Sequence, residues 1–308
     1  MIVARTLDPA DLLEAMRMGV NEWVAEPLNL DELAAAIQRV AKPTLRPQIG
    51  RSIAVIGAKG GIGSTTVSVN LATCLRRTSK QPTLLIDMHL AHGDAAVFLG
   101  VEPRFSIVDA LENIHRLDEA YLKGLVTTTK PGVDLLSSSS NLLRGSFDTA
   151  RVRTLLELAS TTYRYVVLDC PRSDATMLEA IDTASQIVVL ANQELTTLRT
   201  ASRILTGLRQ RCGNDRVKLA LTRLDPKAEI GQTDVERVLG SPVKYVFPND
   251  YQSSLRAITR GEPLILQNHS RLAASFERIA RDLGGLAAAE QQKDSAKQGL
   301  FGRLGSRR

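Results

Sequence analysis

The stretch of sequence that decides the fold is a glycine-rich loop between an apolar run and a helical pattern, and it reads Ile53-Ala-Val-Ile-Gly57-Ala-Lys59-Gly-Gly-Ile-Gly63-Ser64-Thr65-Thr66. A strand, such a loop and the start of a helix, in that order, form the context of a phosphate-binding loop. Its glycines let backbone N–H groups surround an anion, and the N-terminus of the helix adds a partial positive charge. The loop departs from the usual pattern at one position, because Ser64 stands where a Gly-Lys-Ser/Thr ending has its lysine.

The chain beyond this loop alternates apolar runs with helical patterns. This order predicts an α/β fold, a doubly wound and mostly parallel sheet with helices on both faces. The strands are predicted at residues 53–56, 83–86, 133–136, 165–168, 187–190 and 217–221. Because these runs are short, continuous and rich in β-branched residues, they suit a sheet that is buried on both sides. Such sheets bind ligands beyond the carboxyl ends of their strands.

Two aspartates stand at such strand ends. Asp87 follows the strand predicted at 83–86, and Asp169 follows the strand predicted at 165–168. An acid at the end of a buried strand is costly unless a cation or a hydrogen-bond donor faces it. Beside a phosphate loop, the pair suggests Mg²⁺ held by Thr65 and, through water, by Asp169. The structural alternative is that either aspartate caps the helix that follows it.

The composition is that of an ordinary soluble protein, since 44% of the 308 residues are hydrophobic and 23% are charged. No apolar run reaches the ~18 residues that a membrane span requires. Cys74, Cys170 and Cys212 lie far apart, so we expect small core residues in a reducing, cytoplasmic compartment. The net charge of +6 is mild and lies partly in the C-terminal tail, so nucleic-acid binding is not expected.

The N-terminal residues predict a small piece with the order helix, strand, helix, and its strand contains Trp23 and Val24. Residues 1–41 resemble the second half of a response-regulator receiver domain. The half that carries the phospho-acceptor aspartate in that family is missing, and Glu26 stands where the family has a lysine. We therefore expect a docking or dimerisation role for this piece, and not phosphate signalling.

A piece of about forty residues cannot bury a stable core alone. Either it packs on the main domain, or the natural chain starts further upstream. Residues 42–50, which contain two prolines and show no periodicity, are predicted to be a linker.

Four motifs of the main domain resemble those of the ParA/MinD ATPases, a group of P-loop NTPases, over residues 51–286. Lys59 to Thr66 resembles their deviant Walker A motif, and Asp169-Cys-Pro resembles their Walker B ending. Leu221-Thr222-Arg223 stands where that family has its adenine contact. The fourth motif is Phe247-Pro248-Asn249-Asp250, which is followed by Ala257, Gly261 and Pro263.

This resemblance implies a site for ATP or ADP with Mg²⁺ and a homodimer in which Lys59 reaches the partner's nucleotide. The implied catalytic residues are Lys59 and Asp87, and the implied metal ligands are Thr65 and Asp169. The implied nucleotide-binding residues are Lys59, Gly60, Gly61, Ile62, Gly63, Ser64, Thr65, Thr66, Arg223, Pro248 and Asp250.

Within this family, the sequence is most similar to the CpaE/TadZ branch, which positions Flp/Tad pilus machinery. The receiver-like residues 1–41, the small residue Ser64 and the run after Asp169 carry that likeness. It implies pilus and secretion proteins as partners and a polar location, or a peripheral one at the inner membrane. The alternative is a partition or positioning ATPase that acts on DNA or on the membrane. A third alternative is a metabolic enzyme of the same fold. The sequence shows no second substrate motif, which a ligase would need, and no cysteine pairs, which an iron–sulfur reductase would need.

Two departures from the family pattern predict slow or absent ATP hydrolysis. Ser64 lacks the positive charge that spans the β- and γ-phosphates, and His89 replaces the second aspartate after Asp87. Loss of one such group commonly lowers the rate on the order of 10²–10³-fold. His89 is expected either to bind water or to face solvent. Thr222, in place of the family asparagine, is expected to weaken selectivity for adenine.

The tail, residues 287–308, is basic. Leu300, Phe301 and Leu304 would share one helical face with arginines beside it. This pattern resembles the membrane-binding tail of MinD-type proteins and predicts contact with a membrane surface through residues 297–308. The alternative is a solvated terminus, because each glycine in the tail costs a helix about 1 kcal/mol.

Overall fold

The computed structural model describes residues 49–139, 148–172, 174–267 and 270–286, and, nearer the N-terminus, residues 2–4, 15, 20, 23–29, 32–33 and 36. Its contacts divide the chain into two units, Met1–Ile49 and Gly50–Arg308. Most of the expected linker and the whole tail lie outside the described residues.

The N-terminal unit contains a two-stranded parallel sheet in which β1 (Ile2–Ala4) pairs with β2 (Trp23–Ala25). The strand expected at Trp23 and Val24 is therefore present, whereas β1 was not predicted. The two helices expected on either side of β2 lie largely outside the described residues, which include four helical positions, Ala15, Glu32, Leu33 and Ala36.

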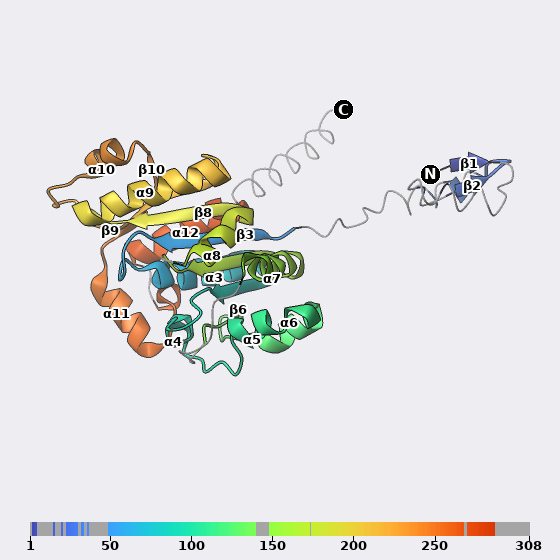
Figure 1. Cartoon of the computed structure of the whole chain (residues 1–308), viewed down its shortest axis with the longest axis horizontal. Helices are drawn as coiled ribbons and strands as arrows, with labels where there is room; N and C mark the ends of the chain where they lie inside the picture. The colour runs from blue at the N-terminus through green and yellow to red at the C-terminus, as the bar shows by residue number, and fades with distance from the viewer. Residues whose placement is uncertain are drawn as a thin grey trace, which may run out of the picture. The chain divides into compact units, whose positions relative to one another are not determined.

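The second unit is built on an eight-stranded sheet with the order β10-β9-β8-β3-β7-β4-β6-β5, which is parallel except for the β5–β6 pair (Figure 1). The six strands that the sequence predicts are all present, and the edge strands β5 and β10 were missed. The bounds are β3 (Arg51–Gly57), β4 (Thr83–Asp87), β5 (Thr127–Thr128), β6 (Asp134–Leu136), β7 (Tyr165–Cys170), β8 (Gln186–Ala191), β9 (Val217–Leu224) and β10 (Val243–Pro248).

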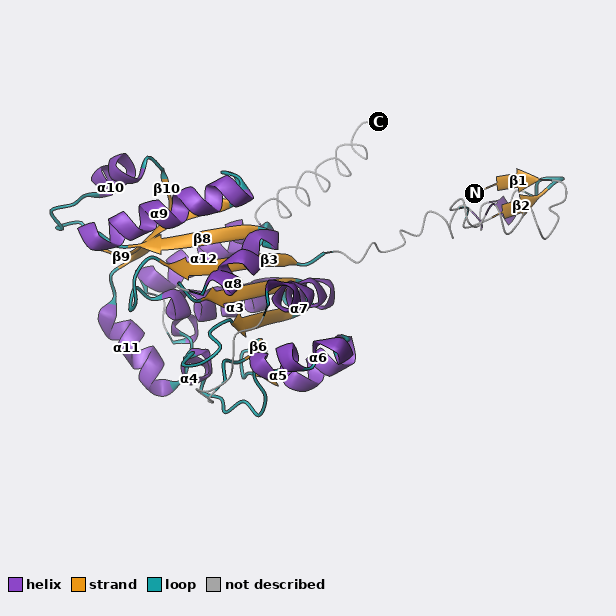
Figure 2. Ribbon diagram, in the orientation of Figure 1, coloured by secondary structure: helices purple, strands orange, loops and turns teal. Residues whose placement is uncertain are grey.

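Helices cover both faces of this sheet (Figure 2). One face packs against α5 (Ile107–Glu112), α6 (Glu119–Leu125), α7 (Thr149–Thr162), α8 (Ala175–Ala180), α9 (Leu195–Cys212) and α10 (Gln232–Leu239). The other face packs against α3 (Ser64–Ser79), α4 (Ala95–Leu99), α11 (Tyr251–Arg260) and α12 (Arg271–Leu283). Three short 3₁₀ turns lie at Ile114–Arg116, Ile181–Thr183 and Leu264–Leu266. The predicted doubly wound α/β fold is confirmed.

The central strand β3 shows how the sequence produces two cores. Side chains of a strand alternate between its faces, so Ala54 and Ile56 enter one core while Ile53 and Val55 enter the other, and all four are fully buried. The three cysteines are free and buried, as expected of core residues. Among the described residues, no helix is both long and apolar enough to cross a membrane.

Candidate functional site

The glycine-rich loop, residues 57–66, connects β3 to α3 as the sequence predicts. Gly61 and Gly63 adopt φ angles of 73° and 100°, which favour glycine because the residue has no Cβ. Gly63 is the N-cap of α3, so the unpaired N–H groups of the first helical turn point toward the loop. The apolar face of α3 that includes Val67 and Leu71 is buried and fixes the helix on the sheet.

The carboxyl end of β9 holds this loop from a distant part of the chain. The Thr222 hydroxyl donates to the carbonyl of Ile62 at 3.1 Å, and Nη2 of Arg223 donates to the carbonyl of Gly61 at 2.6 Å. Arg223 adopts the left-handed region with a φ of 52°. Since the Thr222 hydroxyl is buried and bound to the loop, its role in the structure is to position the loop.

A cavity of about 120 Å³ opens beside the loop, and its walls contain most of the residues expected to bind a nucleotide. Phe247, Tyr251 and Leu255 supply an apolar wall that suits a planar base. Of the expected residues, those that line the cavity are Ile62, Gly63, Thr66, Arg223, Pro248 and Asp250. Asp250 also caps α11, because its carboxylate accepts the N–H of Ser253 at 3.1 Å.

Lys59 lies apart from this cavity, on the surface of the chain. Its Nζ donates to Oε2 of Glu194 at 2.9 Å and lies 3.5 Å from the Thr196 hydroxyl. Both charged side chains are about half exposed, 50% for Lys59 and 54% for Glu194. The hydrogen bond from Lys59, followed by one from Asn192, lowers the pKa of Glu194. Sequence reasoning missed Glu194, although its place just after a buried strand was a usable signal.

Asp169 lies at the end of β7, fully buried, and receives two hydroxyl donors from α3. The Thr65 hydroxyl donates to its Oδ2 at 2.7 Å, and the Ser68 hydroxyl donates to its Oδ1 at 3.1 Å. The expected pair of Thr65 and Asp169 is therefore in contact. Asp169 does not cap the following helix, α8, whose N-cap is Asp174.

Asp87 pairs directly with Asp169 across the neighbouring strands β4 and β7, and it is also fully buried. Its carboxylate accepts the backbone N–H of Ala95, the first residue of α4, at 3.2 Å. The N-cap residue of α4 is Asp94, so Asp87 is not the cap itself, although its carboxylate accepts one free N–H of the first turn. The side of Asp87 that faces Gly93 is closely packed, because a Cβ on Gly93 would lie 2.1 Å from Oδ2 of Asp87.

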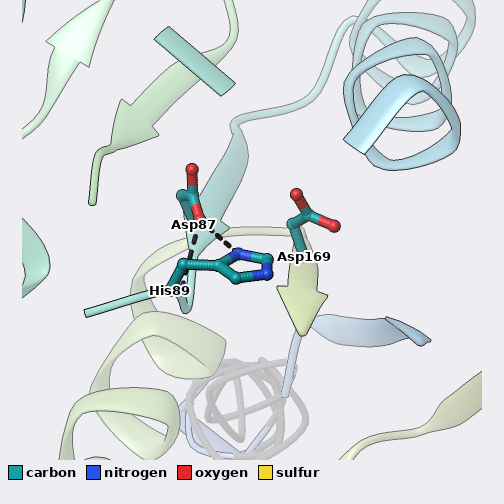
Figure 3. Close-up of side chains that lie close together, drawn as sticks. All are labelled: Asp87, His89 and Asp169. Carbon is teal, nitrogen blue, oxygen red and sulfur yellow. Dashed lines mark hydrogen bonds and ion pairs between the residues drawn. The ribbon is translucent and has the colours of Figure 1, made fainter. Parts of the chain in front are cut away.

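His89 faces these acids. Its Nδ1 lies 2.8 Å from Oδ1 of Asp87, its backbone N–H donates to the same oxygen at 3.2 Å, and its side chain is 29% exposed (Figure 3). The expectation of a solvent-facing His89 is therefore wrong. The ring lies between the two carboxylates, and the three residues come from β4, the loop after it and β7.

Burial is the largest single influence on the pKa values of Asp169 and His89. It is the largest influence that raises the pKa of Asp169 to about 7, and the charge of Asp87 adds to it, against the hydroxyl donors. Burial lowers the pKa of His89, but the hydrogen bond and charge of Asp87, with the charges of Asp169 and Asp94, outweigh it, so the pKa lies above 6.5.

The protein freed of divalent cations is expected to be less stable at pH 8 than at pH 6. A carboxyl whose pKa is raised on folding favours the folded state fully below its unfolded value of ~3.9, and this contribution is lost as pH rises through about 7. His89 acts in the same direction, because its raised pKa gives stability that is complete below 6.5 and lost as pH rises through the folded value.

Urea unfolding at pH 6, 7 and 8 in the presence of a chelator measures this slope. The Asp169→Asn variant, which has the same shape and no charge, should flatten it. A natural chain that is equally stable or more stable at pH 8 would contradict the assignment.

The donor set fits Mg²⁺. Two buried carboxylates and the Thr65 hydroxyl offer oxygen ligands at the carboxyl end of the sheet, beside the loop, and hard cations prefer oxygen. Thr65 and Asp169 are the residues that would hold the ion, directly or through water. Bound there, Mg²⁺ supplies positive charge against the phosphates of a nucleotide.

Comparisons with known proteins agree with this geometry. A family model described as an AAA domain matches residues 50–219, which is more than half of the chain. The chain therefore belongs to this family, as a P-loop ATPase of the ParA/MinD type. The putative septum site-determining protein MinD of Tupiella akineta is 30% identical to it over 264 residues, which cover 82% of this chain and 84% of that protein.

Solved structures show the same fold. A ParA family ATPase from Chlorobium tepidum TLS has a TM-score of 0.70 at 23% identity and covers 75% of this chain and 98% of its own. The septum site-determining protein MinD of Pyrococcus horikoshii OT3, complexed with Mg-ADP, has a TM-score of 0.67 at 20% identity and covers 77% of this chain and 97% of its own.

Proposed function

We propose that the chain is a positioning ATPase of the ParA/MinD type that binds ATP or ADP with Mg²⁺. It forms a homodimer when ATP is bound, and it hydrolyses ATP slowly. One observation carries the proposal. The glycine-rich loop, the apolar cavity beside it and the contact between Thr65 and Asp169 lie together at one edge of the sheet, and this supports their roles as phosphate cradle, base pocket and metal ligands.

Each part of the site has a role in binding. The N–H groups at the start of α3 face the phosphates, and the helix end adds a favourable partial charge. Arg223, Pro248 and Asp250 line the cavity that receives the base and ribose. The Mg-ADP bound to the Pyrococcus horikoshii relative supports the choice of ligand.

The chemical step is where this chain is weak. Ser64, the first residue of α3, offers a hydroxyl where a lysine would place a charge on the phosphates. His89 binds Asp87 and brings no permanent negative charge to orient an attacking water. The site therefore retains the ability to bind a nucleotide, whereas its ability to hydrolyse ATP is reduced.

The relatives favour a positioning role over the pilus role that Ser64 and residues 1–41 suggested. They are septum site-determining proteins and a ParA family ATPase. Contact with a membrane surface through residues 297–308 stays a prediction from the sequence, because those residues lie outside the described part of the chain. Flotation with liposomes, with and without these residues, tests it.

The position of Lys59 supports a dimer. Its side chain is half exposed and does not line the cavity of its own chain, so it could contact the nucleotide of a second copy. Its ion pair with Glu194 is exposed, and exposed ion pairs are worth only about 0–1 kcal/mol, so exchange with a partner's phosphate is inexpensive.

Calorimetry with ATP and Mg²⁺, combined with sedimentation, is expected to show nucleotide binding and an ATP-dependent dimer. The Lys59→Ala variant should still bind nucleotide, with an affinity within about tenfold, because the loop and cavity are unchanged. Its ATP-dependent dimer should be lost.

The matched control is Lys123→Ala, because Lys123 also pairs with a carboxylate on the surface, that of Glu119 on α6. This variant should dimerise normally. Absence of binding to both ATP and ADP would refute the proposal, and normal dimerisation of Lys59→Ala would refute the role of Lys59.

A further inference from the structure

The cluster of Asp87, His89 and Asp169 contains a histidine, which a magnesium site does not need. Each residue offers one ligand atom, and the three atoms lie within 4.8 Å of one another (Figure 3). Two of these atoms are carboxylate oxygens, and the third is an imidazole nitrogen. Mg²⁺ takes oxygen ligands, so the nitrogen points to another class of ion.

We propose that Asp87, His89 and Asp169 form a binding site for a first-row transition-metal dication, Mn²⁺ or Co²⁺, and that His89 makes the site select such an ion over Mg²⁺. Carboxylates suit Mn²⁺, and imidazole raises the affinity for the later metals of the series, which bind nitrogen more strongly. The site shares Asp169 with the Mg²⁺ site described above, and all three of its ligands come from one chain, so it needs no nucleotide atom.

The distances suit a shared ion. Nδ1 of His89 lies 2.8 Å from Oδ1 of Asp87. Two ligands at right angles, each about 2.1 Å from an ion, are about 3 Å apart, so these two atoms already have the spacing of neighbouring ligands. Asp169 stands on β7, which is hydrogen-bonded to β4, and its ligand atom lies within 4.8 Å of those of Asp87 and His89.

Other groups hold the ligands in place, as outer contacts do in metal sites. The backbone N–H of Ala95 holds Asp87, and the hydroxyls of Thr65 and Ser68 hold Asp169. These donors take one oxygen position each and leave the carboxylates with further lone pairs for an ion. The absence of a Cβ at Gly93 leaves the Asp87 carboxylate in this position.

Charge gives the reason for binding. Asp87 and Asp169 are both fully buried and adjacent, which is costly without a compensating cation. A bound dication neutralises both at once. The competing explanation is that the protonated ring of His89 is itself the counter-ion, and this is an outcome of the test.

The experiment uses the full chain, freed of nucleotide and of metal. Co²⁺ is added while its visible absorption is recorded, Mn²⁺ is added while the free ion is followed by electron paramagnetic resonance, and Mg²⁺ is used as competitor. We expect one Co²⁺ or Mn²⁺ per chain and poor displacement by Mg²⁺. The His89→Ala variant should bind Co²⁺ at least about tenfold more weakly.

Two variants make the test specific. His89→Asp replaces nitrogen by oxygen and should shift the preference toward Mg²⁺ by about tenfold or more. His115→Ala, at an exposed histidine outside the cluster, should behave as the natural chain. Circular dichroism confirms that each variant is folded.

Three results would overturn the proposal: no stoichiometric Co²⁺ or Mn²⁺, equal affinity in His89→Ala, or an unchanged metal preference in His89→Asp. Any of them would leave a protonated His89 as the counter-ion. Because no nucleotide is present, such a failure does not touch the proposed ATPase function, which calorimetry tests separately.

Discussion

A Ser64→Lys variant is expected to hydrolyse ATP about 10²-fold faster than the natural chain. Ser64 is the first residue of α3, directly after the N-cap Gly63, so a lysine there extends from the loop that holds the phosphates. Its positive ammonium would stabilise the negative charge that develops on the phosphate oxygens in the transition state, and one such group is commonly worth on the order of 10²–10³ in rate. Phosphate release with saturating ATP and Mg²⁺ measures the effect.

Ser64→Met is the control, because methionine has a similar length and no charge. This variant should not exceed the natural rate. Addition of His89→Asp to Ser64→Lys should raise the rate further, since it supplies a permanent carboxylate beside Asp87. A Ser64→Lys variant that binds ATP but is no faster would show that the missing lysine does not limit the reaction.

A Gly93→Ala variant is expected to lose about 3 kcal/mol of unfolding free energy. The new Cβ would lie 2.1 Å from Oδ2 and 2.4 Å from Oδ1 of Asp87, a carboxylate that is fully buried. Overpacking of a buried site costs roughly 1–3 kcal/mol, and displacement of the carboxylate from its N–H donors adds to this. Urea unfolding of the two proteins gives the difference.

A second mutation shows whether the clash with Asp87 is the cause. In an Asp87→Ala background, the Cβ of residue 93 meets no carboxylate, so Gly93→Ala should cost less than about 1 kcal/mol there. Gly207 in α9 has no atom within 4 Å of its added Cβ, and Gly207→Ala should stabilise the chain by about 0.5–1 kcal/mol. Equal costs of Gly93→Ala in both backgrounds would disprove the clash.

Much of the fold follows from the sequence because its buried strands are continuous β-branched runs. The strands β5 and β10 escaped this reasoning, since β5 has two residues and β10 is an edge strand that ends in Pro248. The meeting of Asp87 and Asp169 was foreseeable in part, because carboxyl ends of parallel strands share one edge of a sheet.

Contacts between distant parts of the chain were not foreseeable. The pairing of Lys59 with Glu194 depends on β8 lying next to β3, and strand order is not written in any local pattern. The contact of His89 with Asp87 depends on the turn after β4, which the residue types alone do not specify. The need for glycine at position 93 appears only when the buried carboxylate beside it is located.

The two contacts from the end of β9 fix the conformation of the glycine-rich loop, which its glycines alone would leave flexible. Glycine-rich segments are flexible, and ordering one on ligand binding costs conformational entropy. Here the side chains of Thr222 and Arg223 donate hydrogen bonds to two consecutive carbonyls of the loop, those of Ile62 and Gly61. The entropy is therefore lost during folding, and the phosphate cradle is preorganised before any ligand arrives. Because the same residues line the cavity, a base that moves β9 also moves the cradle.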